Sequence, residues 1–374
     1  MRIVLVGGGT GGHFYPLIAI AEAVRGRDRE KGESSELFYL GPDPYNQASL
    51  DEFNIKFVQV PAGKNRVGYG GFLNFLDLFK TFFGVVAAFF KLLFLYPDAI
   101  MSKGGYTSVP VVLAAWLLRI PIVIHESDAV PGRANLFAAR FALYIGIAHG
   151  DVEEYFDVKK VALVGMPIRS VISTPISDSY KLLGIPKDRP VILVTGGSSG
   201  AERLNNFIIA SLSRLLQEFT VVHQVGDANV KSVSSSVSTL FVDREPLGYY
   251  FVFGHLGGEQ FAAALQSANL VIARAGSTTL FEIAKNGKPS IIVPIPEDLS
   301  RDQRSNAYAY ARRTGAVVLE EDNLSDDILV AEINRILKDE SVALEMGAKA
   351  RSLTVGDAAY TLADTLRAIA EEHQ

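Results

Sequence analysis

A glycine-rich turn near the start of the chain is the first segment that could carry chemistry. It consists of Gly7-Gly8-Gly9-Thr10-Gly11-Gly12, follows the apolar run 3–6, and is followed at once by His13. Glycines at a strand-to-helix turn let an anion approach the free N–H groups and the positive dipole end of the helix. An ordinary imidazole titrates near about 6.5, so its neutral form is available near neutral pH. The segment predicts a phosphate-binding turn with a candidate general base, His13, beside it.

Two further glycine turns stand in equivalent places. Gly104-Gly105-Tyr106 follows the apolar run 99–101, and Gly196-Gly197-Ser198 follows the run 191–195. One such turn is often only a tight connection without a ligand, but three of them favour anion binding. The first turn also fits G-x-G-x-x-G, yet the second predicted strand ends without the acidic residue that binds the ribose of a dinucleotide. A nicotinamide-dependent oxidoreductase is therefore a minor alternative.

Two polar clusters complete the candidate chemistry. In the first, an apolar strand ends in His125-Glu126-Ser127-Asp128, and His125 and Glu126 are rival candidates for the general base. In the second, Arg274-Ala275-Gly276-Ser277 is followed by Glu282 and, further on, by Asp302-Gln303. Either cluster alone is compatible with a helix start and its capping residues. Neither contains an Asp-x-Asp pair, so we expect that no metal ion is required.

The elements that must position these residues are apolar, β-branched runs that alternate with helical segments along the whole chain. This alternation predicts an α/β fold with parallel sheets covered on both faces. A strand, a glycine turn and a helix occur from residue 3 and again from residue 191, which predicts two Rossmann-like domains facing a cleft. We place the domains at 1–164 and 165–357, with the C-terminal helix, about 358–374, packing back on the first domain. The predicted strands are 3–6, 36–40, 99–101, 121–125, 143–147, 191–195, 219–225, 270–273, 290–293 and 316–319.

The composition excludes several classes of protein. The chain has 374 residues, no cysteine and a net charge of −5, from 36 Lys and Arg against 41 Asp and Glu. It therefore needs no disulfides, suits a reducing cytoplasm, and lacks the overall positive charge that nucleic-acid binding uses. Residues 1–164 carry 16 basic and 16 acidic side chains, so the acidic surplus lies beyond them. The N-terminus leads directly into the strand 3–6, which is not typical of a signal peptide.

The most apolar part of the chain is the segment 72–94, which holds eight of the 22 phenylalanines. Lys80 and Lys91 leave only ten uncharged residues between them, whereas a membrane-spanning helix needs about 20, so we do not expect spanning. Small and polar positions recur at helical spacing, which predicts one or two amphipathic helices. One hypothesis buries both faces inside the protein. The other docks part of the segment into the headgroup layer of an anionic membrane, through Phe72, Phe75, Phe79, Lys80 and Phe82.

Taken together, these segments resemble the MurG family, the peripheral membrane N-acetylglucosaminyltransferases of peptidoglycan synthesis. The resemblance covers nearly the whole chain, and so many ordered motifs are a far more specific signal than one glycine fingerprint. The motifs are Gly8-Gly9-Thr10-Gly11-Gly12-His13, Gly104-Gly105-Tyr106, His125-Glu126, Gly196-Gly197-Ser198 with Gly200-Ala201, Arg274-Ala275-Gly276 with Glu282, and Gln303 with Asn306-Ala307.

The resemblance implies a GT-B-type hexosyltransferase that moves N-acetylglucosamine from UDP-GlcNAc to the 4-hydroxyl of undecaprenyl-diphospho-MurNAc-pentapeptide (lipid I), with inversion, giving lipid II. It implies no cofactor, a place on the cytoplasmic face of the bacterial plasma membrane, and roles in cell wall biogenesis, cell shape and cell division. The catalytic residues would be His13 and Glu126. The donor-binding residues would be Thr10, Gly11, Gly12, Asp128, Arg169, Ser198, Ser277, Thr278, Thr279, Leu280, Phe281, Glu282 and Gln303. The acceptor-binding residues would be Gly104, Gly105, Tyr106 and Asn135.

Some positions depart from the family pattern. Ser127-Asp128 stands where the family has Gln-Asn, Ser199 stands for glutamine, and Met166 stands for asparagine. The segment 253–260 is longer than the family's uracil-binding segment, so we assign no uracil contact.

Two alternatives to this function stay open. A UDP-GlcNAc 2-epimerase of the same architecture would need no lipid acceptor, and a membrane-docked protein that has lost turnover would bind the donor without transferring it.

Overall fold

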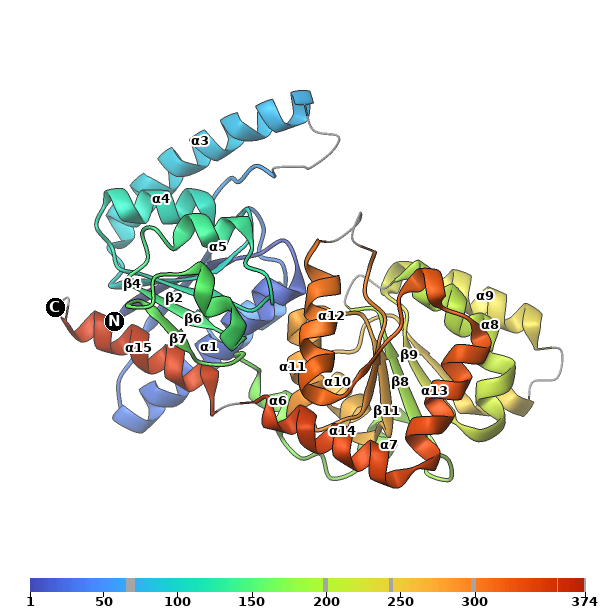
Figure 1. Cartoon of the computed structure of the whole chain (residues 1–374). Coiled ribbons are helices and arrows are strands. Elements are labelled where there is room, and N and C mark those ends of the chain that lie inside the picture. The colour runs from blue at the N-terminus through green and yellow to red at the C-terminus, as the bar shows by residue number, and fades with distance from the viewer. Residues whose placement is uncertain (65–70, 198–200, 242–244, 297–300, 355, 373–374) are drawn as a thin grey trace. The chain divides into compact units, whose positions relative to one another are not determined.

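The computed structural model describes residues 1–64, 71–197, 201–241, 245–296, 301–354 and 356–372, apart from the side chains of 71–74, 76, 245 and 301. The chain forms two compact units (Figure 1). Unit 1 comprises Met1–Arg169 with Val355–Gln374, and unit 2 comprises Ser170–Thr354. Each unit contains one parallel sheet with helices packed on it, so the predicted α/β class with two Rossmann-like units is confirmed.

The sheet of unit 1 has seven parallel strands in the order β3-β2-β1-β4-β5-β6-β7. The strand order changes direction between β1 and β4, and open α/β sheets bind ligands beyond the carboxyl ends of their strands at such a point. The strands are β1 (Arg2–Gly7), β2 (Glu36–Gly41), β3 (Ile55–Gln59), β4 (Ala99–Gly104), β5 (Ile122–Glu126), β6 (Tyr144–Ile147) and β7 (Val161–Leu163). The helices are α1 (Gly11–Lys31), α2 (Gln47–Glu52), α3 (Gly71–Leu95), α4 (Val109–Leu117), α5 (Arg133–Ala138), the 3-10 helix η1 (Gly150–Tyr155) and α15 (Ala358–Glu372).

Both faces of this sheet are covered. Ile3 and Leu5 of β1 belong to a core that includes α1 and α15, whereas Val4 and Val6 belong to a core that includes α3 and α4. This alternation follows from the two-residue period of a strand. The C-terminal helix α15 lies along α1 (Figure 1). Its buried Arg367 donates to Oδ1 of Asp28 in α1 at 2.9 Å, so an ion pair as well as apolar packing attaches the end of the chain to unit 1.

The sheet of unit 2 has six parallel strands in the order β10-β9-β8-β11-β12-β13. Its strand order changes direction between β8 and β11. The strands are β8 (Val191–Thr195), β9 (Thr220–Gln224), β10 (Tyr250–Phe253), β11 (Leu270–Ala273), β12 (Ser290–Ile292) and β13 (Val317–Val318). The helices are α6 (Ser170–Ser173), α7 (Ser179–Leu183), α8 (Glu202–Glu218), α9 (Val230–Leu240), α10 (Gly258–Ser267), α11 (Ser277–Lys285), α12 (Arg301–Thr314), α13 (Asp326–Lys338) and α14 (Glu340–Ser352), with the 3-10 helices η2 (Asp227–Asn229), η3 (Glu245–Tyr249) and η4 (Glu321–Asn323).

Every strand predicted from the sequence is present, and β3, β7 and β10 are additional. All three lie at an edge of their sheet. Several of their side chains remain exposed or half-buried, so these strands lack the continuous apolar run by which the inner strands are recognised.

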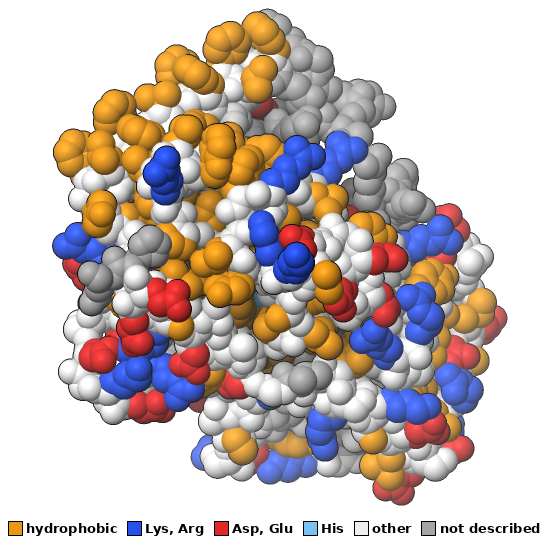
Figure 2. All heavy atoms as spheres, turned by 60° about the vertical axis from the view of Figure 1, so that its left-hand side comes forward, with side chains coloured by type: hydrophobic (Ala, Val, Ile, Leu, Met, Phe, Trp, Pro, Cys, Tyr) orange, Lys and Arg blue, Asp and Glu red, His pale blue; other side chains and the backbone are white. Residues whose placement is uncertain are grey.

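The phenylalanine-rich segment forms one helix, α3, and the hypothesis that both of its faces are buried is wrong for the side chains that the structure describes. Its small and polar stripe faces the protein, where Gly84 approaches the backbone of Pro61 so closely that a Cβ would lie 2.1 Å from the carbonyl oxygen. The phenylalanine face points outward, with Phe75, Phe79 and Phe82 between 48% and 62% exposed. Figure 2 shows hydrophobic side chains gathered over this part of unit 1.

By length and composition alone, Asp77–Leu95 is also apolar enough to cross a membrane. The two lysines therefore do not by themselves exclude spanning, contrary to our expectation. The side chain of Phe72 lies outside the described residues.

Candidate active site

His13 lies in the first turn of α1, directly beyond the carboxyl end of β1. Thr10 precedes the helix in an extended conformation, and its Oγ1 is hydrogen-bonded to Nδ1 of His13 at 2.8 Å. The backbone N–H of His13 also donates to the Thr10 carbonyl oxygen at 3.2 Å. The hydroxyl of Thr10 therefore fixes the orientation of the imidazole.

The glycine turn after β4 lies against the other edge of this ring. Gly105 has a left-handed backbone (φ 76°), and a Cβ at this position would lie 3.7 Å from Cδ2 and Nε2 of His13. Gly104 is also left-handed (φ 87°), and its Cβ would lie 2.6 Å from Oδ1 of Asn135, too close for any side chain. The predicted base and the predicted acceptor residues thus meet at the carboxyl edge of one sheet.

Glu126, the last residue of β5, is 2% exposed. Its Oε1 accepts the N–H groups of Ser127 at 2.7 Å and Asp128 at 2.9 Å. Its Oε2 accepts the N–H of Gly132 and the side-chain amide of Asn135, both at 2.9 Å. Burial and the charge of Asp128 raise the pKa of Glu126, and these hydrogen bonds oppose the rise. A carboxylate that four donors already occupy organises its loop, which argues against the catalytic role that the sequence suggested for Glu126.

Lys103, near the end of β4, is a buried cation beside these residues. It is 1% exposed, and its Nζ donates to Oγ of Ser127 at 2.7 Å. Burial and the charge of Lys103 lower the pKa of His13 to about 4, while the Asp128 carboxylate acts in the opposite direction. Burial also lowers the pKa of Lys103, against the charges of Glu126 and Asp128. The imidazole of His13 is therefore neutral at pH 7 and able to accept a proton.

His125, the other rival base, points into the protein. Its ring is fully buried, and Nε2 is hydrogen-bonded to the carbonyl oxygen of Gly165 at 2.8 Å. Burial and the charge of Lys103 lower the pKa of His125 well below its ordinary value. Because neighbouring residues of a strand point to opposite faces, His125 and Glu126 cannot serve the same site.

In unit 2, the predicted donor residues lie beyond the carboxyl ends of β8 and β11. Gln303 of α12 accepts, through Oε1, the N–H of Ala275 at 3.3 Å and of Ile295 at 3.4 Å, so it connects two loops. Gln224, at the end of β9, connects two others. Its Nε2 donates to the carbonyl oxygen of Gly197 at 3.1 Å, and its Oε1 accepts the N–H of Leu256 at 3.3 Å.

The start of α11 supplies further predicted donor residues. Ser277 and Glu282 are each 6% exposed, and Thr278 and Thr279 are half-buried. Leu280 and Phe281 are core residues, so a ligand could reach only their backbone. Ser198, predicted to bind the diphosphate, lies outside the described residues.

Two arginines of the predicted motifs already have partners. Arg274 is buried, pairs with Glu321, and donates to the carbonyl oxygen of Val293 at 3.0 Å, so it braces the loop after β11. Arg169 belongs to unit 1, where its guanidinium lies 4.3 Å from the ring centre of Tyr15 in α1.

Comparisons with known proteins agree with this arrangement. Residues 3–147 match the glycosyltransferase family 28 N-terminal domain, and residues 191–362 match the C-terminal domain of the same family. A relative from Treponema denticola is 35% identical over 90% of this chain and 87% of its own length, and one from Acetivibrio thermocellus is 31% identical over 99% and 98%. Both are named UDP-N-acetylglucosamine–N-acetylmuramyl-(pentapeptide) pyrophosphoryl-undecaprenol N-acetylglucosamine transferase. The chain belongs to the MurG family.

Solved structures show the same fold. The MurG of Acinetobacter baumannii superposes with a TM-score of 0.73 at 25% identity, covering 98% of this chain and 99% of that one. A putative UDP-N-acetylglucosamine 2-epimerase from Listeria monocytogenes gives a TM-score of 0.72 at 14% identity, covering 99% and 97%, and shares the fold alone. This MurG-family chain is therefore a glycosyltransferase of the GT-B type.

Sequence reasoning assigned no role to Lys103 in this MurG-family site, and it named Ser127 only within the cluster 125–128 and as a departure from the family pattern. The predicted strand 99–101 stops two residues before Lys103, whereas β4 continues to Gly104. A signal was present, since Lys103 directly follows an apolar strand and directly precedes the paired glycines.

Among the described residues, no group of three or more His, Asp or Glu side chains is placed to hold a metal ion.

Proposed function

We propose that this chain transfers N-acetylglucosamine from UDP-GlcNAc to the 4-hydroxyl of undecaprenyl-diphospho-MurNAc-pentapeptide. The observation that carries the proposal is its identity of 31–35% over at least 87% of the length of relatives named for this reaction. In the reaction, the acceptor oxygen bonds to C1 of GlcNAc from the face opposite UDP. The bond from C1 to UDP breaks, and its electron pair leaves with UDP.

His13 is the proposed base for the acceptor hydroxyl. In the tautomer whose Nδ1–H donates to Thr10 Oγ1, across the 2.8 Å contact, the lone pair resides on Nε2, the atom beside Gly105. The proton of the 4-hydroxyl would pass to Nε2 as the new bond forms. His13 is supported over Glu126 and His125 because those two side chains are almost fully buried and already hydrogen-bonded.

The acceptor would lie along the turn 104–106. Tyr106 packs on Gly9, whose Cβ would lie 2.9 Å from Tyr106 Cε1, so the two glycine turns support each other. Nζ of the exposed Lys64 lies 5.2 Å from the centre of the Tyr106 ring, where it adds positive charge for an anionic acceptor. The side chain of Asn135 packs directly against Gly104 and so supports this turn.

The donor would be held by unit 2. The N-termini of α8 and α11 would direct the positive ends of their helix dipoles at a diphosphate, with Ser198 as an expected ligand. Glu282 would accept from the ribose hydroxyls, and the side-chain N–H₂ group of Gln303 would face the sugar while its carbonyl oxygen connects the loops. Departure of UDP would then be stabilised by helix dipoles, N–H groups and Arg169, without a required metal ion.

An anionic membrane surface is the proposed location of the acceptor-binding unit. The exposed face of α3 carries Phe75, Phe79 and Phe82, with Lys80 exposed beside them. One face of the helix is packed along α4 and the loop 61–63, which favours docking in the headgroup layer over spanning.

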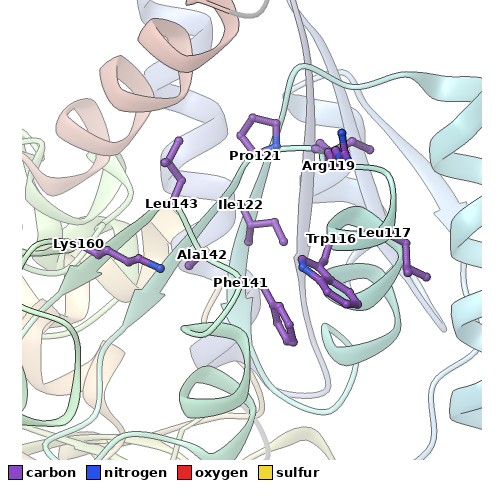
Figure 3. Close-up of a pocket in the computed structure, with 10 residues that line it drawn as sticks. Trp116, Leu117, Arg119, Pro121, Ile122, Phe141, Ala142, Leu143 and Lys160 are labelled. Carbon is purple, nitrogen blue, oxygen red and sulfur yellow. The ribbon is translucent and has the colours of Figure 1, made fainter.

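A pocket of about 580 Å³ lies at the end of α4, the helix on which α3 packs (Figure 3). Trp116 and Phe141, whose ring centres are 5.0 Å apart, form its apolar wall. Arg119 and Lys160 also line it. Apolar and cationic side chains together suit the glycerol and phosphate region of a lipid layer.

The proposal is tested with radiolabelled UDP-GlcNAc and purified lipid acceptor. We expect butanol-extractable label to appear only when the acceptor is present. Conversion of UDP-GlcNAc without acceptor would instead favour the epimerase, and donor binding without any conversion would favour a protein that has lost turnover.

A further inference from the structure

The charges around the His13 turn come from two neighbouring strands of unit 1. Lys103 stands at the end of β4, and Glu126 and Asp128 stand at the end of β5. Among the residues that the structure describes, further titratable or charged side chains lie on elements packed against this turn. They are Tyr106 with Lys64 over its ring, Tyr15 with Arg169 over its ring, Tyr39, Tyr45 and His125. Lys103 and Asp128 are the two charges that act on His13 most strongly, in opposite directions.

The position of Lys103 is fixed on all sides. Its stem passes Gly7, where a Cβ would lie 2.8 Å from the Cβ of Lys103, so only glycine fits there. Its Nζ reaches Oγ of Ser127 at 2.7 Å. Two residues further along, Gly105 lies beside the imidazole of His13. A side chain that is 1% exposed cannot turn toward solvent, so its charge stays close to the ring.

Asp128 is held on the same side by Glu126. The backbone N–H groups of both Ser127 and Asp128 donate to Oε1 of Glu126, at 2.7 Å and 2.9 Å. These bonds fix the backbone of Asp128, which directly follows Ser127, the residue whose hydroxyl Lys103 contacts. Burying a cation costs free energy unless an anion compensates it, and Asp128 together with Glu126 supplies that compensation.

We propose that Lys103 and Asp128 are positioning residues for sugar transfer, a buried cation and a neighbouring carboxylate that balance the charge around His13. Lys103 adds to burial in favouring the neutral imidazole, the form that can accept a proton. Asp128 keeps that imidazole basic enough to take the proton and stabilises the imidazolium once it forms. Neither residue needs to touch the substrate. The inference rests on the proposed role of His13 as the base.

The test is an NMR titration of the His13 ring in the full chain labelled with ¹³C-histidine, assigned by comparison with H13Q. In K103M, we expect the titration midpoint to rise by about 1 pH unit or more, as removal of one nearby charge causes. In K103M/D128N, we expect it to fall back toward the original value. K159M, which removes an exposed lysine of the same unit, is the matched control and leaves the midpoint unchanged.

A purely structural role of Lys103 and Asp128 would not shift the titration midpoint of His13 in opposite directions. A midpoint that stays in place, or that moves in the same direction on removal of either charge, would overturn the proposal. Should K103M not fold by circular dichroism, D128N alone decides, because its His13 midpoint must then fall. The titration needs no substrate. If the midpoints move as expected but the acid limb of kcat/KM does not follow them, the assignment of His13 as base fails and the charge balance stands.

Discussion

The Thr10 hydroxyl holds Nδ1 of His13 at 2.8 Å, and this contact leaves Nε2 as the nitrogen that faces the glycine turn 104–106. A ring held in this way can accept a proton only while it is neutral. Burial and the Lys103 charge favour the neutral ring, which sets the pH range in which the protein should work.

The first prediction concerns that pH range. The pKa of His13 is lowered to about 4, so protonation removes the base only as the pH falls toward 4. We expect kcat/KM to stay level from pH 8 to about 5, without the loss near about 6.5 that an ordinary histidine would cause. A profile of initial rates at low substrate concentration measures this. An acid limb with a midpoint near 6.5 that persists with a second buffer system would contradict it.

The second prediction tests whether Glu126 stabilises its loop or acts as a catalytic base. In E126Q, one of the two oxygens becomes an N–H₂ group, so two of the four buried donors lose their acceptor. Each such loss costs about 1–3 kcal/mol, and we expect the free energy of unfolding to fall by at least about 2 kcal/mol. Denaturant unfolding measures the loss, and E154Q at an exposed site is the control. Unchanged stability together with abolished transfer would restore Glu126 as a catalytic group.

Most of what the sequence predicted depends on local signals. Apolar runs locate the inner strands, and glycines mark the turns at their carboxyl ends, so the residues around His13 and Gly105 could be expected to meet. The periodicity of α3 did not show which stripe faces the protein. The small stripe is buried because Gly84 lets the backbone of Pro61 approach, a contact between segments that composition does not encode.

The sequence also did not predict where each strand ends. Extension of β4 to Gly104 buries Lys103, and a two-residue difference at a strand end turns an expected loop cation into a core cation. The opposite directions of His125 and Glu126 follow from strand geometry, but which of them faces the site depends on register, which the sequence does not specify.

The third prediction concerns His223 on β9, in the core of unit 2. Its Nδ1 is hydrogen-bonded to the Tyr250 hydroxyl at 2.9 Å and its Nε2 to Oδ1 of Asn205 at 3.1 Å. Burial lowers the pKa of His223 to about 3. Between about 6.5 and 3 the unfolded chain therefore binds a proton that the folded chain does not, so this histidine makes stability fall as the pH is lowered.

We expect H223Q to be less stable than the native chain at pH 7, with a difference that shrinks by a few kcal/mol, roughly, on going to pH 4. Urea unfolding at both pH values measures it. H255Q, at an exposed histidine of the same unit, is the control. A difference between H223Q and the native chain that is equal at both pH values would rule out the proton linkage.

The fourth prediction concerns the membrane face of α3. The variant F75S/F79S/K80E replaces three exposed side chains, so thermal unfolding should be nearly unchanged. Binding to vesicles of phosphatidylglycerol and phosphatidylcholine should weaken by about tenfold or more, since apolar insertion and one cationic contact are lost. Co-sedimentation measures binding, with the exposed unit 2 variant L240S/L344S/K231E as the matched control. Equal binding by the two variants would place the membrane contact elsewhere.

The fifth prediction tests the central claim, which is GlcNAc transfer to a lipid-linked acceptor with His13 as the base. The most direct measurement is the rate at which label from UDP-GlcNAc enters the butanol-extractable lipid product, for the native chain, H13A and the exposed-site control K159A. We expect the native chain and K159A to be equally active, and H13A to lose about 10²–10⁴-fold in kcat with little change in UDP-GlcNAc affinity. A fully active H13A enzyme would contradict the assignment of the base, and a native chain that forms no lipid product would contradict the function.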